Sequence, residues 1–530
     1  MLRTARSFNG MVVAPHRLAA EAGLSVLREG GNAIEAMIAA ASTIAVVYPH
    51  MNGLGGDGFW LIGKAGSPPI GIRGCGRAAR GADREWFTKQ GLASIPSRGP
   101  LSAVTMAGAV SSWDRADYIS RARFGGRLPA SRLLQDAIRY AWEGVAVTES
   151  LHANAAAKLD QLRDVPGFAD LYLADGAPVP VGHRLRQPKL ADTLTRLSQT
   201  DFSDFYRGEL ARSMAADLEK AGSPLRLEDF QRHEAAEVTP LAVDVAGHTV
   251  YNLPPPTQGL ASLLILALYA RNPAREGDSA DHLHRLVEAT KAAFRIRNDH
   301  VTDPDYMTAD PATFLQDDEI ARLAAGLSDE QAAPWPHPPK AGDTVWLAAT
   351  DQRGLTVSFI QSIYWEFGSG LVLPGTGITW QNRGTSFELD EAGVNAYTPG
   401  RLPFHTIQPA MAELSDGRLM AYGTMGGEGQ PQTQAAVFTR HVLHGQDLQS
   451  AVTAPRWLLG RTWGEESTNL KIENRVDPAV IEALKARGHD IRMAGAFEEF
   501  MGHAGAIVRH PDGLLEGAYD PRSDGAVSAR

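Results

Sequence analysis

The chain has 530 residues, of which 44% are hydrophobic and 21% charged, a composition typical of a globular protein that argues against large-scale disorder. This length exceeds one ordinary hydrophobic core, so it predicts several domains or one large layered unit. The net charge of -10 at pH 7 provides no long-range attraction to nucleic acid or to an anionic membrane, so neither is expected as a partner.

The N-terminal region and the single cysteine indicate the compartment. Residues 1–15 contain two arginines but no apolar segment long enough for a signal peptide, so we expect a cytoplasmic protein. Cys75 is the only cysteine, which excludes an intrachain disulfide, and we expect it to be a small buried side chain. The most apolar run, 33–48, is too short to span a membrane and contains Glu35, which favours a buried helix.

The first elements are predicted to be two helices and a strand. Apolar residues at helical spacing predict a helix over 14–30, and Asn32 can cap a second, nearly all-apolar helix over 33–47. The glycine-rich segment 53–58 then leads into a strand at 59–62. This order, helix to loop to strand, is the reverse of a phosphate-binding loop, so we do not expect a nucleotide site.

The region from Arg73 to about Gln331 has mostly helical periodicity. Its strongest amphipathic stretches are 131–142, 191–199 and 282–299, and a strand pair is predicted over 241–252. His282 and His284 lie two residues apart, which places them on different faces of a helix, so we interpret them as core or solvated histidines. No spacing of metal ligands is found here, and we expect no metal and no cofactor.

The periodicity changes after the proline-rich segment that begins at Pro334. Strands are predicted over 345–349 and 355–363, joined by a hairpin at 352–354. Further strands are predicted at 370–372, 410–414 and 418–422, and further helices at 433–444 and 478–487. The chain therefore has a mixed content of helices and strands.

Thr344 lies where the proline-rich segment meets the first of these strands. A threonine hydroxyl is a poor nucleophile near neutral pH and needs a neighbouring base. If the chain is cut between Asp343 and Thr344, the freed α-amine, with an unperturbed pKa of about 8, becomes that base within the same residue. The junction is therefore predicted to be a maturation site, with an ordinary strand threonine as the alternative.

Several motifs in fixed order resemble the γ-glutamyltransferases, which are N-terminal-nucleophile (Ntn) hydrolases that cut themselves before a threonine. The strand Thr344-Val-Trp-Leu-Ala-Ala-Thr-Asp351 is similar to the strand that carries their nucleophile, although its second and third residues differ. The other matching segments are Gly53–Gly58, Pro254–Gly259, Phe367–Gly370, Gly423–Gly427 and Tyr519–Ser523. Each motif is weak alone, but the resemblance covers nearly the whole chain.

This resemblance implies the fold and the subunit organisation. The fold class would be α+β, an Ntn-hydrolase four-layer αββα sandwich formed jointly by the two fragments of one autoprocessed chain. Residues 1–343 would be the large fragment, and residues 344–530 the small fragment that begins with the nucleophile. The fragments would stay together as a heterodimer, and a dimer of heterodimers is left open.

The resemblance also implies catalytic roles for four residues. Thr344 matches the nucleophile, and Ser362 matches a hydroxyl that lies eighteen residues later and supports autocleavage in the family. Gly426 and Gly427 match paired glycines whose N–H groups stabilise the tetrahedral oxyanion. A plain turn is the alternative interpretation of these two glycines.

The substrate side of the site is predicted from the same matches. Arg73 matches a family arginine that grips the substrate carboxylate, which a guanidinium can do bidentately; a surface arginine is the alternative. His405 and Thr406 stand where the family has a pair of serines. They keep hydrogen-bonding capacity but add a ring.

The family's site for the substrate α-ammonium is altered in this chain. Its positions fall on Tyr364, Arg383 and Ser386, so no carboxylate remains among them and one has become a cation. An ammonium beside Arg383 would meet like-charge repulsion, whereas a carboxylate would be attracted. We therefore predict a self-processing threonine amidohydrolase that acts on a small anionic amide with an adjacent carboxylate, such as oxamate.

Three alternatives remain open at this point. One is a true γ-glutamyltransferase or glutathione hydrolase, and another is a glutaryl-type acylase, because Arg383 would also suit a dicarboxylate monoamide. The third is a processing-dead binding protein, since Val345 and Trp346 depart from the family pattern directly after the nucleophile.

Overall fold

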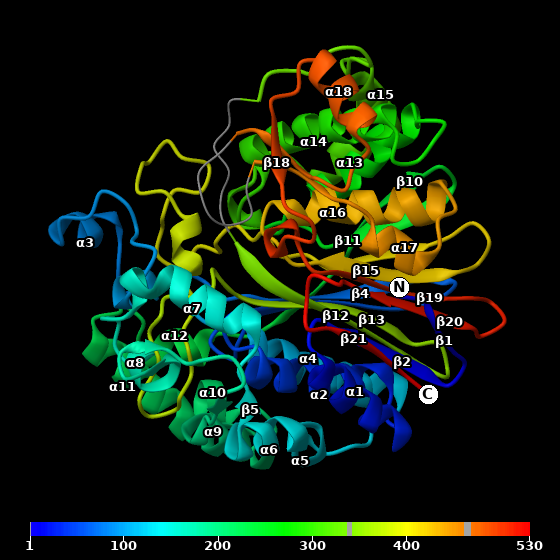
Figure 1. Cartoon of the computed structure of the whole chain (residues 1–530). Helices are drawn as coiled ribbons and strands as arrows, with labels where there is room; N and C mark the ends of the chain where they lie inside the picture. The colour runs from blue at the N-terminus through cyan, green and yellow to red at the C-terminus, as the bar shows by residue number, and fades with distance from the viewer. Residues whose placement is uncertain (1, 336–341, 461–467) are drawn as a thin grey trace.

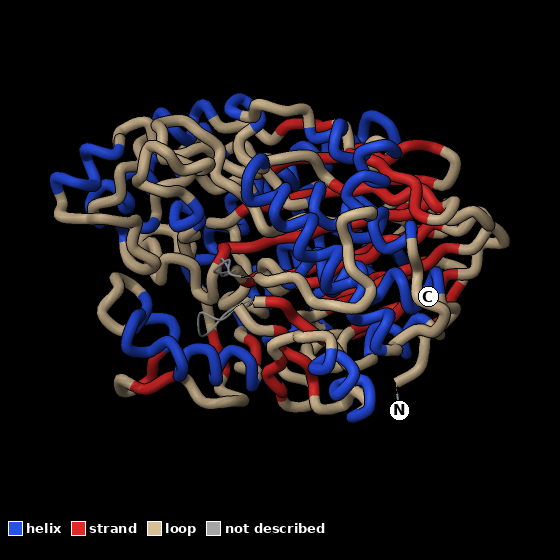
Figure 2. Tube along the Cα trace, turned by 90° about the horizontal axis from the view of Figure 1, so that it is seen from above, coloured by secondary structure: helices blue, strands red, loops and turns tan. Residues whose placement is uncertain are grey.

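The computed structural model describes residues 2–335, 342–460 and 468–530. Two β-sheets form its centre, and helices cover the outer face of each sheet (Figure 1). Both termini lie at the same end of the molecule (Figures 1 and 2). The first and last strands of the chain, β1 (Ala5–Ser7) and β21 (Ala526–Ala529), are edge strands of the two different sheets.

The first sheet contains the Thr344 strand. Seven described strands form it with antiparallel neighbours, in the order β21-β2-β12-β13-β3-β4-β9. Their bounds are β21 (Ala526–Ala529), β2 (Gly10–Ala14), β12 (Asp343–Asp351), β13 (Thr356–Tyr364), β3 (Asp57–Lys64), β4 (Ser67–Gly74) and β9 (Ala236–Val238). Strand β12 has neighbours on both sides, so its backbone is fixed well inside the sheet.

The second sheet also has seven described strands, in the order β1-β20-β19-β15-β14-β11-β10. Their bounds are β1 (Ala5–Ser7), β20 (Leu515–Tyr519), β19 (Ala504–Arg509), β15 (Leu419–Thr424), β14 (Ala410–Glu413), β11 (His248–Asn252) and β10 (Leu241–Val245). Neighbouring strands are antiparallel here too. Residues 2–335 and 342–530 contribute strands to both sheets, so each sheet is built from both parts of the chain.

The two sheets are packed face to face through apolar side chains. Phe59, Trp346 and Ile360 of the first sheet belong to one buried cluster with Met411 and Ile507 of the second. Successive side chains of a strand point to opposite faces of its sheet, so every second residue of these strands can face the other sheet.

Helices cover the two outer faces (Figure 1). Those on the Thr344 sheet are α1 (Arg17–Arg28), α2 (Ala33–Val47) and α4 (Ala109–Phe124). Those on the other sheet are α13 (Gly259–Arg271), α16 (Gly429–Phe438) and α17 (Leu448–Thr453), and α14 (Ala280–His300) packs on α13 and α16. Every residue of α2 is buried, because it packs against α1, α4 and α6 (Gln135–Glu143) as well as β12 and β13.

Smaller elements extend this central unit. The segment between β4 and β9 forms α3 (Arg84–Lys89), α5 (Ala130–Leu133), α6 (Gln135–Glu143), β5 (Val145–Ala146), α7 (Glu149–Leu162), α8 (Phe168–Tyr172), β6 (Leu173–Ala174), β7 (Ala177–Pro178), β8 (Arg184–Leu185), α9 (Pro188–Gln199), α10 (Asp204–Arg207), α11 (Glu209–Ala221) and α12 (Leu227–Arg232). The remaining α-helices and strands are α15 (Asp317–Ala324), β16 (Trp457–Leu459), β17 (Leu470–Glu473), α18 (Pro478–Ala486) and β18 (Ile491–Ala494). The short helices are η1 (Pro100–Ser102), η2 (Pro304–Tyr306), η3 (Pro311–Leu315), η4 (Arg383–Ser386), η5 (Thr439–Leu443) and η6 (Glu499–Met501).

The predicted early helices are confirmed, and so is the cap between them. The Asn32 carboxamide oxygen accepts hydrogen bonds from the backbone N–H groups of Ile34 and Glu35. The Glu35 carboxylate accepts one from the Asn32 backbone in return, which completes a capping box. Helices α9, α14 and α18 also fall within the predicted ranges to a few residues.

The strand predictions are confirmed except for one. Strands β12 and β13 pair as the expected antiparallel hairpin, and β10, β11, β14 and β15 lie where the pattern placed them. The strand predicted at 370–372 is wrong: Val372 makes only an isolated bridge to Thr379. This short apolar run instead helps to fill a separate cluster with Phe168 and Phe367, so burial rather than pairing explains it.

The described helices include none that combines the length and the apolar character needed to cross a lipid bilayer. Helix α2 is apolar enough to suggest one, but it has 15 residues and is enclosed by protein.

Candidate active site

Thr344 is fully buried at an irregular point of strand β12. In the pairing with β13, Asp343 lies opposite Tyr364 and Val345 opposite Gln361. Two residues of β13, Ser362 and Ile363, therefore face the single residue Thr344, which is the pattern of a β-bulge. This bulge brings the residue predicted to support cleavage, Ser362, opposite the predicted nucleophile.

The loop between β15 and helix α16 lies beside Thr344. Gln430, in the first turn of α16, donates a hydrogen bond from Nε2 to Thr344 Oγ1 at 3.3 Å. Just before this helix, Gly426 and Gly427 have φ angles of 115° and 50°, a region that other residues rarely adopt. The N-terminus of a helix adds positive potential where an oxyanion would form.

The segment immediately before the predicted cleavage site lies against these same groups. A Cβ atom on Gly342 would lie 3.0 Å from Thr406 Oγ1, 3.1 Å from the Tyr364 ring and 3.2 Å from Gly427 Cα. A Cβ on Gly427 would in turn approach the Gly342 carbonyl oxygen to 2.8 Å. In the continuous chain, glycine at both positions therefore allows the backbone to cross the turn closely.

A buried polar network holds the turn from behind. Gln258 donates from Nε2 to the carbonyl oxygens of Thr406 (2.6 Å) and Gly427 (2.8 Å). Arg297 donates to Gln258 Oε1 and to Glu428 Oε1, each at 2.9 Å. Gln258 belongs to the segment Pro254–Gly259, so this motif positions the turn rather than reacting itself.

Arg383 carries a buried positive charge next to this turn. Its side chain is 0% exposed, and its guanidinium carbon lies 3.9 Å from the centroid of the Tyr364 ring. Nη1 donates a long hydrogen bond of 3.5 Å to Thr406 Oγ1, whereas Nε and Nη2 have no hydrogen-bond partner among the described residues. Buried polar groups are almost always paired, so these N–H groups indicate a binding site for an acceptor.

Asp57 and His405 form a buried pair behind Arg383. His405 Nε2 lies 2.9 Å from Asp57 Oδ2, and its Nδ1 lies 2.8 Å from the carbonyl oxygen of Pro403. Asp57 Oδ1 accepts hydrogen bonds from the Gly108 backbone and from Gln381 Nε2. Both ring nitrogens of His405 are thus engaged by protein, so Thr406 is the member of the predicted pair that keeps a hydroxyl facing Arg383.

The charges in this cluster act on one another. Burial lowers the pKa of Arg383, and the neighbouring Tyr364 and Asp57 oppose that shift. Burial and then the Arg383 charge lower the pKa of His405, whereas its hydrogen bond to Asp57 raises it. Asp57 and Arg383 are 4.0 Å apart, too far for a hydrogen bond.

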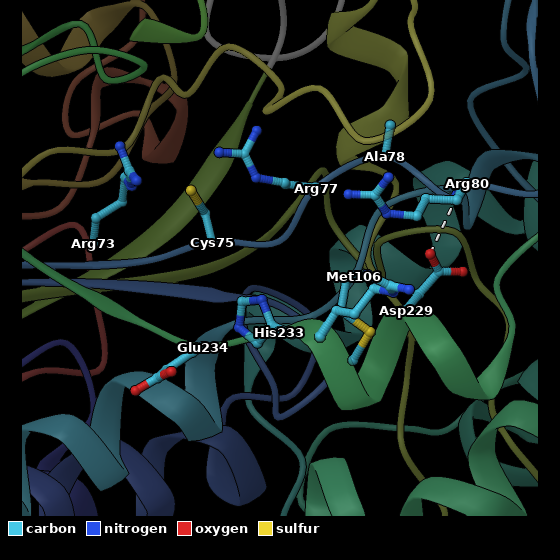
Figure 3. Close-up of a pocket in the computed structure, with 10 residues that line it drawn as sticks. Arg73, Cys75, Arg77, Ala78, Arg80, Met106, Asp229, His233 and Glu234 are labelled. Carbon is cyan, nitrogen blue, oxygen red and sulfur yellow. Dashed lines mark hydrogen bonds between the residues drawn. The ribbon is translucent and has the colours of Figure 1, made fainter. Parts of the chain in front are cut away.

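Arg73 lines a separate cavity of about 390 Å³ whose described lining includes neither Thr344 nor Arg383. Figure 3 shows Arg73 and Cys75 extending from the same side of the β4 segment, as residues two apart on a strand do. Cys75 is buried as expected, and burial and then the Asp57 charge raise the pKa of its thiol. The charges of Arg73 and Arg383 oppose this rise of the thiol pKa in part.

The two residues that depart from the family pattern after Thr344 are part of the core. Trp346 packs between the sheets, where a Cβ on Gly423 would lie 2.2 Å from the indole ring, and its Nε1 donates to Ser358 Oγ at 3.0 Å. Val345 is fully buried in the cluster on the other side of β12. Both side chains fill space in the hydrophobic core, so the packing of the two sheets accommodates these departures from the family pattern.

Ser386 ends the short helix η4 that begins at Arg383. Its hydroxyl donates to the Arg383 carbonyl oxygen at 2.9 Å, so it stabilises the turn that presents the guanidinium. Tyr364 has a φ of 82°, an unusual conformation for a bulky residue, and such strain is often found at functional sites.

Sequence analysis missed Asp57, Gln258 and Gln430 as members of the site. Asp57 and Gln258 lay inside glycine- or proline-rich segments that were already recognised as motifs, and Gln430 follows the Gly423–Gly427 motif by three residues. The sequence signal that could have identified them is a polar side chain next to glycines in a segment expected to be buried.

A histidine cluster lies on the far side of α14. The ligand atoms of His284, Glu288 and His489 lie within 4.8 Å of one another, and all three residues are buried. His284 Nε2 is 2.8 Å from the Ser328 carbonyl, and Glu288 binds the Lys291 ammonium at 2.7 Å. Hydrogen bonds within the protein account for this cluster, which fits the interpretation of His284 as a core residue.

The family model for gamma-glutamyltranspeptidase matches residues 19–530. The oxamate amidohydrolase proenzyme of Klebsiella pneumoniae subsp. pneumoniae is 52% identical over 522 residues, covering 98% of each chain. The glutathione hydrolase-like YwrD proenzyme of Bacillus subtilis is 40% identical over 524 residues, again 98% of each. Among solved structures, a cephalosporin acylase from Bacillus halodurans superposes with a TM-score of 0.91 at 35% identity, covering 100% of this chain and 97% of that one.

Proposed function

The chain belongs to the gamma-glutamyltranspeptidase family, whose members here include Ntn-type amidohydrolases, and we propose that it hydrolyses a small amide with an adjacent carboxylate, with oxamate as the preferred substrate. The observation that carries this proposal is the buried guanidinium of Arg383, whose Nε and Nη2 have no hydrogen-bond acceptor within the described part of the chain. A carboxylate bound there would satisfy both groups in the fork geometry that arginine favours.

Maturation would use the chain's own residues. The Thr344 hydroxyl attacks the Asp343 carbonyl, the C–N bond breaks, and the new ester is hydrolysed by water. The products are a fragment 1–343 and a fragment 344–530 that starts with a free α-amine. The four-layer αββα sandwich would then be formed by both fragments as a heterodimer.

In the mature enzyme the α-amine would take the proton of the Thr344 hydroxyl as it attacks the substrate amide. The oxyanion would be stabilised by N–H groups at Gly426 and Gly427, next to the N-terminus of α16. Ammonia leaves with that proton, and water then hydrolyses the acyl-enzyme. For oxamate the products are oxalate and ammonium.

The approach of Gly342 to Gly427, Thr406 and Tyr364 supports this assignment. The peptide that precedes the scissile bond contacts the groups proposed to bind substrate, so one oxyanion site would serve both cleavage of the chain and cleavage of the amide. Gln430 holds the Thr344 hydroxyl from the same turn.

A second candidate is an acylase for dicarboxylate monoamides, because the cephalosporin acylase structure is so similar over the whole chain. A panel of oxamate, glutaryl amide and a γ-glutamyl anilide, with ammonia or aniline release as the readout, separates the candidates. We expect oxamate to have the highest kcat/KM. Preference for glutaryl amide would favour the acylase.

Ser362→Ala is expected to slow maturation without abolishing it, because the bulge brings this residue opposite Thr344. Its hydroxyl also accepts a hydrogen bond from the Tyr364 backbone at 2.8 Å, so the strained residue would be less well fixed. The rate of fragment formation after synthesis, followed by gel, is the measurement. Thr350→Ala, on the neighbouring strand β12, is the control, and equal rates for Ser362→Ala and wild type would remove the role.

Arg73→Ala tests whether the cavity residue also helps to bind substrate. If Arg73 contacts the carboxylate, its loss costs about 1.5 to 3 kcal/mol, or roughly a ten- to hundredfold lower kcat/KM. Arg232→Ala, on the wall of the same cavity, is the control for a general change of charge there. Normal kinetics in a processed Arg73→Ala enzyme would return the residue to a structural role.

A further inference from the structure

The hydrogen bonds around His405 require more protons than a neutral histidine beside an ionised carboxylate provides. A carbonyl oxygen only accepts, so the contact with Pro403 places a proton on His405 Nδ1. A second proton must then lie between His405 Nε2 and Asp57 Oδ2, which are 2.9 Å apart. Without it, two lone pairs would face each other in a buried site.

We propose that Asp57 is a positioning residue that, together with His405, holds one proton and thereby leaves the charge of Arg383 available to a substrate carboxylate. With the proton present, the Asp57–His405 pair is neutral wherever the proton resides, and the site has a net charge of +1 from Arg383. When the proton is lost, the Asp57 carboxylate, 4.0 Å from Arg383 Nε, cancels that charge. The site then loses its attraction for an anion.

The fixed contacts of Asp57 support this role. Its second oxygen accepts from the Gly108 backbone at 3.1 Å and from Gln381 at 3.2 Å, so the carboxylate cannot rotate to reach Arg383 without breaking hydrogen bonds. The register of the sheet places Asp57 opposite Ser362, one strand further from Thr344. Asp57 therefore acts through Arg383 and His405 rather than on the reacting atoms.

Three titratable groups near the pair, His233, Cys75 and Tyr206, stay uncharged near neutral pH. Burial lowers the pKa of His233 to about 4, and burial raises the pKa values of Cys75 and Tyr206. The groups that act electrostatically on Asp57 or directly on its partners come from several elements: Arg383 and Tyr364 beside the site, Cys75 and Arg73 on the β4 side, Asp303, His233 and Tyr206. Loss of the proton from the Asp57–His405 pair therefore changes the net charge around Arg383, whereas the three uncharged groups do not change it.

This inference rests on the proposed function only for the identity of the anion, so the test measures binding without turnover. Oxalate, which cannot be hydrolysed further, is titrated into the processed enzyme by isothermal calorimetry between pH 5 and 9, in two buffers of different ionisation enthalpy, because the pKa of His405 is lowered. We expect the affinity to fall with rising pH by roughly tenfold per unit above the titration of the pair, and binding there to take up one proton.

Two variants should move this dependence in opposite directions. In Asp57→Asn the carboxamide still accepts from Gly108 and Gln381 and donates to His405 Nε2, so Arg383 stays uncompensated at every pH. The alkaline loss of affinity and the part of the proton uptake due to the pair should disappear. In His405→Gln the carboxylate stays ionised, so oxalate should bind at least tenfold more weakly than to wild type at pH 5, where the wild-type pair holds its proton.

The α-amine of Thr344 also titrates in this range, so the comparison between variants carries the test. Asp303→Asn, a buried aspartate paired with Arg77, is the matched control and should keep the wild-type pH dependence. The inference is overturned if Asp57→Asn keeps the alkaline loss, or if both variants weaken binding equally at all pH values. Absence of oxamate hydrolysis by wild type, with the oxalate results as expected, would reject the substrate but not the switch.

Discussion

Replacing Thr344 by alanine is expected to leave one uncut chain of 57.0 kDa without amidohydrolase activity. The variant lacks the hydroxyl that would attack the Asp343 carbonyl, so neither the ester nor the free α-amine can form. The loss should therefore be complete rather than partial. Intact mass spectrometry of the purified protein and ammonia release from oxamate are the measurements.

Two controls make this result specific. Thr344→Ser keeps a hydroxyl and should still mature and retain part of the activity. Thr350→Ala removes a buried hydroxyl on the same strand, which forms a hydrogen bond with the Thr356 hydroxyl at 3.1 Å, and should mature normally. If N-terminal sequencing of a wild-type small fragment begins at any residue other than Thr344, the proposed nucleophile is wrong.

Local sequence patterns predicted the elements that carry this site. The Asn32 cap, the all-apolar helix α2 and the β12–β13 hairpin each depend on residues close together in the chain, and their physical causes can be seen in the sequence. The strand predicted at 370–372 failed because a short apolar run looks the same whether it pairs or packs.

The charged cluster could not be predicted because its contacts join distant parts of the chain. Asp57 and His405 are 348 positions apart, and Arg297 reaches Glu428 across 131. The match to the family's ammonium site identified Arg383 as a cation at one of its positions. It did not indicate that a carboxylate from β3 would lie next to this arginine. Only the pairing of β3 with β13 brings that carboxylate into the site.

The presence of Asp57 refines the second large prediction, which is rejection of γ-glutamyl donors. An α-ammonium placed near Tyr364 and Ser386 would be desolvated beside the Arg383 guanidinium. At about 4 Å and an effective dielectric near 20, that repulsion is on the order of 4 kcal/mol, or roughly a thousandfold in kcat/KM. While the Asp57–His405 pair holds its proton it is neutral, so it leaves this repulsion in place, and the Asp57 oxygens are already bonded to His405, Gly108 and Gln381.

We therefore expect at least a hundredfold lower kcat/KM for a γ-glutamyl amide than for the same amide without its α-amino group. Oxamate is measured alongside, and the two larger amides control for each other because they differ only in the ammonium. Arg383→Gln should narrow the difference between them, since the repelling charge is gone while a hydrogen-bond donor remains. If the γ-glutamyl amide is the best of the three substrates, the ammonium is bound elsewhere, and the protein acts as a γ-glutamyltransferase.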